Sequence, residues 1–115
     1  MMKQIRFLKN WNGKLGCDIF STIRRSNVEK MAYYRGAIGE TFEVVLNKKI
    51  HSHARLFQVI PHPSLRCIPN GILMSDVGTS DVKELERIFK KFQITWRQTP
   101  VMGLWFQRIH EGVIE

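Results

Sequence analysis

The chain has 115 residues, of which 43% are hydrophobic and 24% are charged, so it is long enough for one modest hydrophobic core but not for two. Lysine and arginine number 18 against 10 acidic residues, which gives a formal net charge of +8 at pH 7. This charge favours polyanionic partners, nucleic acid first, and a basic surface that serves only solubility is the alternative. We expect a single domain over residues 1–115, with residues 1–16 as an N-terminal extension.

Two cysteines, Cys17 and Cys67, are too few for a disulfide framework, and the first seven residues hold too short an apolar run for a targeting segment. No stretch approaches the roughly 20 apolar residues that a membrane span needs. We therefore expect a cytoplasmic protein without membrane contact, in which both cysteines are small buried side chains.

Residues 5–8 mix apolar and basic side chains, which predicts a short edge strand. The glycine-rich run at 12–16 has no Gly-Lys-Ser/Thr ending, so it predicts a turn and not a phosphate-binding Walker loop. Residues 19–23 alternate in polarity and include β-branched side chains, which predicts a strand.

Two arginines, Arg24 and Arg25, stand at the exit of that strand. Ser26 and Glu29 match a capping box, so Ser26 is expected to cap a helix over 27–35 that Gly36 closes. The strand would then deliver guanidinium groups beside the partly positive start of a helix. Such a corner suits an anion, most simply a phosphate.

Alternating apolar residues predict strands over 41–46 and 50–60, joined by a polar turn at 47–49 into a hairpin with a basic tip. Pro61 and Pro63 are expected to end the second strand. Residues 68–74 predict a short helical turn. Asp76 is expected in a tight turn, where its carboxylate satisfies nearby backbone donors.

A helix is predicted from about residue 81 to 91, because apolar residues recur at the spacing of one helix face: Leu85, Ile88, Phe89 and Phe92. Residues 101–109 alternate with bulky apolar groups on both faces, which is typical of a central strand. The order strand, helix, strand, strand, helix, strand predicts a small α+β domain, with two or three helices around a curved sheet or a partly open β-barrel.

The segment Ser21-Thr22-Ile23-Arg24 is followed by a Gly-Glu-Thr-Phe-Glu-Val-Val run at 39–45, by Ala54-Arg55-Leu56 and by the strand at 101–109. This order resembles the ASCH domain of the PUA-like superfamily, from about Asp18 onward. The resemblance implies a β-barrel with a cleft beside the Thr-Ile-Arg strand that faces RNA, a nucleoside or another nucleic-acid component.

Some ASCH proteins are acetylcytidine amidohydrolases, in which a lysine three residues before the threonine acts with it and with a later glutamate. Thr22 and Arg24 match the motif threonine and arginine, whereas Ile19 occupies the lysine position. An aliphatic side chain cannot deprotonate a threonine nucleophile, so the sequence favours a protein that is not an enzyme. Thr22 is the candidate for a catalytic residue, and for Asp76 as a catalytic acid the sequence shows no partner.

We expect Thr22, Arg24 and Arg25 to form a nucleic-acid-binding surface that is extended by basic residues of the hairpin: Lys48, Lys49 and Arg55. Because successive strand residues point to opposite faces, Arg24 is placed in the cleft with Thr22, and Arg25 on the other face. The alternative for each basic residue is a solvated side chain without a partner.

Other side chains that could bind a base or a metal ion stand in less specific sequence patterns. Tyr33, Tyr34 and Trp96 are candidates for stacking on bases, although core packing is the commoner role of an aromatic residue. His51 and His53 share a strand face, but no third ligand stands at a recognisable spacing, so no metal or other cofactor is expected.

Three functions remain open. The first is a nucleic-acid-binding domain, with RNA favoured over DNA. The second is a small hydrolase or nuclease that acts on RNA or a modified nucleoside through Thr22, and the third is a protein-interaction domain whose basic charge is incidental. The sequence predicts no oligomeric state.

Overall fold

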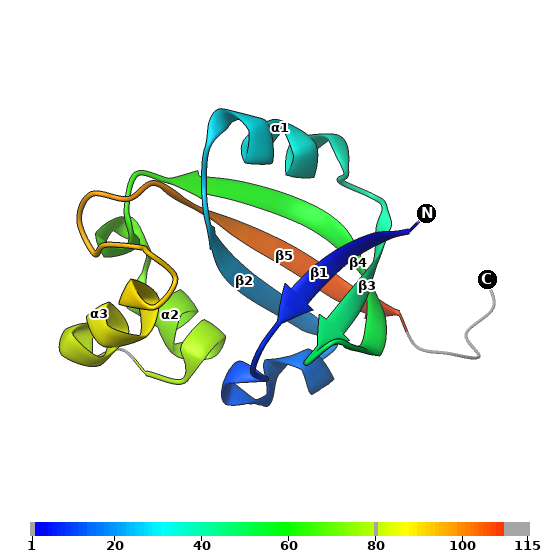
Figure 1. The fold of residues 1–115 in the computed structure, drawn as a ribbon, viewed down its shortest axis with the longest axis horizontal. Coiled ribbons are helices and arrows are strands. Elements are labelled where there is room, and N and C mark those ends of the chain that lie inside the picture. Colours follow the sequence, from blue (N-terminus) through cyan, green and yellow to red (C-terminus); the bar gives the residue numbers. More distant parts are fainter. Residues whose placement is uncertain (1, 80, 110–115) are drawn as a thin grey trace.

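A five-stranded sheet curls into a half-barrel in the computed structural model, which describes residues 2–79 and 81–109 (Figure 1). In sequence order its strands are β1 (Lys3–Phe7), β2 (Ile19–Arg25), β3 (Thr41–Leu46), β4 (Lys49–His62) and β5 (Val101–Ile109). The helices are α1 (Val28–Gly36), α2 (Asn70–Val77) and α3 (Val82–Lys90), with short 3-10 segments η1 (Trp11–Gly16) and η2 (Leu65–Cys67). The predicted small α+β fold with a curved sheet is confirmed.

The strands follow the order β1-β3-β4-β5-β2 across the sheet. β5 is antiparallel to both of its neighbours, β4 and β2, so its predicted central position is confirmed. β1 is parallel to β3 and forms one edge, as predicted for this segment, while β2 forms the other. The half-barrel therefore has an open seam, flanked by β1 and β2.

β4 is longer than predicted and continues through Pro61 to His62. Its pairing with β3 extends only as far as Arg55, whereas its pairing with β5 continues to His62. The last residues of β4 therefore have a free edge on one side. A proline is tolerated there because no neighbouring strand needs its missing N–H, and the prediction that Pro61 ends the strand is wrong.

Two hydrophobic clusters hold the fold together. The first fills the half-barrel and is centred on three rings, with Phe106 stacked on Phe20 at 5.4 Å and edge-on to Phe42 at 5.4 Å. The second joins β2 and β5 to α2 and α3, which lie together at one side of the sheet, apart from α1 (Figure 1). Leu85 and Phe89 belong to this second cluster, as the helical spacing predicts.

Three side chains lie elsewhere than predicted. Phe92 is 44% exposed because α3 ends at Lys90 and the chain then turns through Gln93, whose φ is 60°. Cys17 and Cys67 are exposed, since each lies at the end of a short 3-10 segment on the surface. Among the described residues, no helix is long and apolar enough to cross a membrane.

The N-terminal cap of α1 is Asn27 and not Ser26. The Asn27 side-chain oxygen accepts a hydrogen bond from the Lys30 backbone N–H at 2.7 Å. The Ser26 hydroxyl and the Glu29 carboxylate make no such bond to a described residue, so the predicted capping box does not form. Asparagine caps helices as well as serine does, and the helix begins one residue later than the box requires.

We expect Asn27→Ala to lower the free energy of unfolding by about 1 kcal/mol, because the Lys30 amide loses its side-chain acceptor. Ser26→Ala is the matched control and should change that free energy by less than about 0.5 kcal/mol. Urea denaturation of both variants measures the two values. A larger loss in Ser26→Ala than in Asn27→Ala would contradict this assignment.

Candidate functional site

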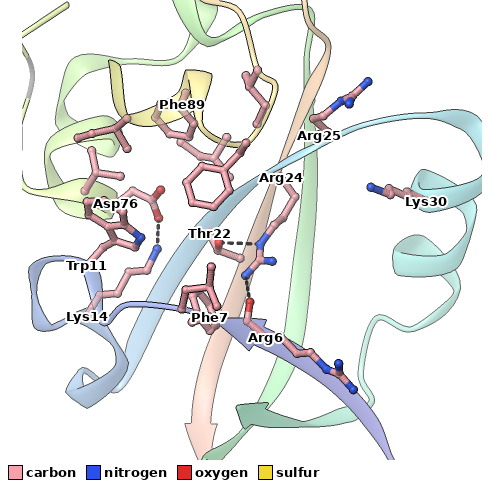
Figure 2. Close-up of a pocket in the computed structure, with 16 residues that line it drawn as sticks. Arg6, Phe7, Trp11, Lys14, Thr22, Arg24, Arg25, Lys30, Asp76 and Phe89 are labelled. Atoms are coloured by element: carbon pink, nitrogen blue, oxygen red, sulfur yellow. Dashed lines mark hydrogen bonds and ion pairs between the residues drawn. The ribbon is translucent and has the colours of Figure 1, made fainter. Parts of the chain in front are cut away.

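A pocket of about 320 Å³ opens at the seam between β1 and β2, next to α2 and α3 (Figure 2). We call it the seam pocket, and six of its residues carry the argument below: Phe7, Trp11, Lys14, Thr22, Arg24 and Asp76. These side chains come from four separate elements of the chain. The pocket is thus a product of the tertiary fold and not of one local motif.

A buried ion pair joins two elements at this pocket. The Lys14 ammonium lies 2.6 Å from the Asp76 carboxylate, and the two residues are only 5% and 3% exposed. Asn12 and Gly13 both adopt left-handed backbone conformations with φ of 56° and 64°, which turn η1 so that Lys14 faces inward. Leu15 then anchors the turn in the core of the half-barrel.

Burial disfavours both charges of this pair. It lowers the pKa of Lys14 and raises the pKa of Asp76, and in each case the attraction of the partner opposes the effect of burial. The Asp76 carboxylate also accepts a hydrogen bond from the backbone of Ile23, on the outer edge of β2. Asp76 therefore connects η1, α2 and β2, and the prediction that it lies in a tight turn and binds local backbone donors is wrong.

Arg24 bridges the open seam of the half-barrel. One terminal N–H of its guanidinium donates to the backbone oxygen of Arg6 on β1 at 2.8 Å, and its Nε–H donates to the Thr22 hydroxyl at 3.1 Å (Figure 2). The guanidinium also lies 4.7 Å from the centre of the Phe7 ring. This one side chain ties together the two edge strands, which share no backbone ladder.

Arg24 keeps its positive charge in a setting that disfavours it. Burial lowers the pKa of its guanidinium, yet an arginine stays protonated in proteins. Among the described residues, no carboxylate lies within ion-pair distance of Arg24. The Asp76 carboxylate attracts the Arg24 charge from a longer distance but is itself paired with Lys14, so an anion bound in the pocket would offset more of the cost of burying Arg24.

The structure brings together some of the residues that the sequence proposes for binding. Thr22 and Arg24 both line the seam pocket, and Thr22 is 4% exposed. Arg25 reaches the rim, but its guanidinium points away from the interior and donates to the Gln93 side chain at 3.2 Å (Figure 2). The different orientations of Arg24 and Arg25 agree with the alternation of a strand.

The basic residues of the hairpin lie elsewhere. Lys48 is in the turn between β3 and β4, Lys49 begins β4, and Arg55 is an exposed residue farther along β4. None of the three lines the seam pocket. Their contribution to binding stays a prediction.

The residues that the sequence proposes for binding do not include Lys14 and Asp76, the pair inside the pocket. Their side chains come from positions that are 62 residues apart, and each position resembles an ordinary polar turn on its own. Lys14 stands between Gly13 and Leu15, and only the fold shows that both Lys14 and Leu15 are buried. No local pattern identifies the partner of Lys14.

Metal-ligating residues do not gather in the part of the chain that the structure describes. Over residues 2–79 and 81–109 there is no group of three or more His, Cys, Asp or Glu side chains that could hold a metal ion. The His51 ring instead makes a 2.9 Å hydrogen bond with the neighbouring Ser52 hydroxyl.

Comparison of the chain with models of known protein families, with curated proteins and with solved structures found no match. The function is therefore argued from the pocket itself.

We expect Lys14→Met to lower the free energy of unfolding by about 3–5 kcal/mol, because it leaves the Asp76 carboxylate buried without a partner. The double variant Lys14→Met, Asp76→Leu removes both charges and should recover most of that loss. Denaturation curves of the two variants test this.

The control for this experiment is an exposed ion pair. Lys3 contacts Glu40 at 2.9 Å, and their side chains are 31% and 49% exposed, so Lys3→Met should have a much smaller effect. Equal losses in Lys14→Met and Lys3→Met would contradict a special role of the buried pair.

Proposed function

We propose that this chain is a nucleic-acid-binding domain, similar to the ASCH domains of the PUA-like superfamily, which takes one nucleotide of a single-stranded RNA into the seam pocket. One observation carries the proposal. Among the described residues that line the pocket there are five basic residues, Arg6, Lys14, Arg24, Arg25 and Lys30, but one carboxylate, Asp76, which is paired with Lys14. The Arg6 and Arg25 side chains point outward and donate to Gln4 and Gln93, so Arg24 and Lys30 are the cations closest to a ligand in the pocket (Figure 2). The pocket thus has an excess of positive charge, which suits a phosphate.

The apolar part of the pocket suits a base. The rings of Phe7, Trp11, Phe89 and Phe92 line it, and the Lys9 ammonium lies over the Trp11 ring, 4.4 Å from its centre. Aromatic side chains bind unstacked bases through their flat faces, with little dependence on sequence. The cations would bind the phosphate of a nucleotide, and the aromatic rings of the cavity would bind its base.

The shape of the pocket favours a single strand over a duplex. A base can enter a cavity only after it leaves its stack. This step costs less free energy for an unpaired nucleotide than for a paired one. The preference for RNA over DNA rests on the resemblance to ASCH domains. The net charge of +8 would attract either polymer over a longer range.

We expect a labelled single-stranded RNA oligomer to bind, with log K falling linearly with log salt at roughly 0.7 per neutralised phosphate. Lys30→Gln should weaken binding about tenfold, because Lys30 lines the pocket, whereas Lys48→Gln removes the same charge from the hairpin turn and should weaken it less than about twofold. Fluorescence anisotropy at two ionic strengths measures both effects.

Two outcomes would count against this proposal. Equal small losses in Lys30→Gln and Lys48→Gln would mean diffuse charge attraction without an organised site. The absence of RNA binding even at low salt would remove the proposal and favour a protein-interaction domain.

A hydrolase is the second candidate function, and one observation favours it. Lys14 enters the same pocket as Thr22, so a lysine is present near the threonine although Ile19 occupies the position where ASCH hydrolases have theirs. The Thr22 hydroxyl already accepts a hydrogen bond from Arg24, a donor that would stabilise its deprotonated form. The Lys14 ammonium, however, is paired with Asp76.

We expect no release of cytidine when the protein is incubated with acetylcytidine. Among the described residues, no side chain accepts a hydrogen bond from the Thr22 hydroxyl, so its proton has no evident acceptor. Chromatography of the reaction mixture measures the product. Turnover that disappears in Thr22→Val would replace the binding proposal with a catalytic one.

A further inference from the structure

A second pocket, of about 390 Å³, lies beside the seam pocket and beneath helix α1. We call it the helix pocket, and its lining is Arg24, Glu29, Lys30, Tyr33, Tyr34 and Met102. Arg24 and Lys30 line both pockets. Figure 2 shows the Lys30 side chain pointing from α1 toward the strand that carries Arg24. The two pockets therefore meet at a shared pair of cations.

The helix pocket offers an aromatic surface of its own. Tyr33 is 48% exposed, and its ring meets the Tyr34 ring edge-on, with centroids 5.0 Å apart. Tyr34 is in turn stacked on the buried Phe42 at 6.2 Å, which connects the pair to the core. Tyr33 is thus a supported ring that still presents a large area to solvent, as a stacking platform requires.

The charges of the helix pocket indicate what it accepts. The carboxylate of Glu29 belongs to the helix pocket alone, where it would repel a second phosphate. Arg24 and Lys30 at the boundary would attract one. The arrangement suits one phosphate at the boundary and an uncharged ring inside the helix pocket, where Glu29 can accept a hydrogen bond from an exocyclic amine.

We propose that the helix pocket is a second nucleotide subsite, so that the site binds a dinucleotide step of a single strand. One base occupies the seam pocket, the connecting phosphodiester lies between Arg24 and Lys30, and the neighbouring base stacks on Tyr33. The inference rests on the proposed function of the seam pocket. An acidic peptide would satisfy the two cations, but it would need two aromatic side chains at the right spacing to cover both aromatic surfaces, whereas every dinucleotide step has two flat rings.

The test compares ligands of one and two bases. Isothermal titration at one low salt concentration gives the Kd of 3′- and 5′-mononucleotides and of the matching dinucleoside monophosphates. We expect the dinucleoside monophosphate to bind at least about tenfold more tightly. It has one negative charge, whereas a mononucleotide has between one and two, so diffuse charge attraction would give the opposite order.

Two substitutions assign the gain to the helix pocket. Tyr33→Leu should abolish the difference between the two ligands and leave mononucleotide affinity within about twofold, whereas Tyr33→Phe keeps the ring and should keep the difference. Because Tyr33 is half exposed and outside both hydrophobic clusters, neither change disturbs the core. Trp11→Ala, in the seam pocket, should weaken both ligands.

Failure of this inference and failure of the proposed function give different results. Mononucleotide binding without a dinucleotide gain, or a gain that survives Tyr33→Leu, would overturn the second subsite while the seam pocket stands. Absence of binding for both ligands and for an RNA oligomer would overturn both proposals.

Discussion

The buried ion pair between Lys14 and Asp76 is the interaction on which the pocket depends. It connects a turn that precedes β2 to a helix 62 residues later, and Asp76 extends the connection to the β2 backbone at Ile23. Neither charge is stable inside the protein without the other, so the pair forms only when η1, α2 and β2 are all in place. The pair fixes the positions of three elements that border the pocket, and a preformed site reduces the entropic cost of binding.

Arg24 combines a structural role with a proposed role in binding. The curled sheet leaves two edge strands without a common ladder, and the guanidinium of Arg24 joins them through the backbone oxygen of Arg6. Its charge nevertheless lacks a carboxylate within ion-pair distance among the described residues. An anion that satisfies this charge would strengthen the seam, so ligand binding and stability should be coupled through one side chain.

The sequence predicts the elements well and the site only in part. Local periodicity identifies β2, β5 and α3, and strand alternation separates Arg24 from Arg25, because each depends on neighbouring residues. Lys14 and Asp76 could not be found in this way, since their relation exists only in the folded chain. The prediction of a capping box was wrong for a different reason. Asn27 and Ser26 are both good N-terminal caps, and the backbone geometry decides between them.

Net charge and local geometry contribute differently to the proposed binding. Most of the 18 basic residues attract a polyanion at long range, and salt screens exposed charges beyond about 10 Å. Arg24 is partly buried, and its guanidinium is held in position by Thr22 and Arg6, so it is screened less. Raising the salt concentration should therefore remove the general attraction first. Binding that persists at high salt would then come from the cations at the seam and the aromatic rings beside them.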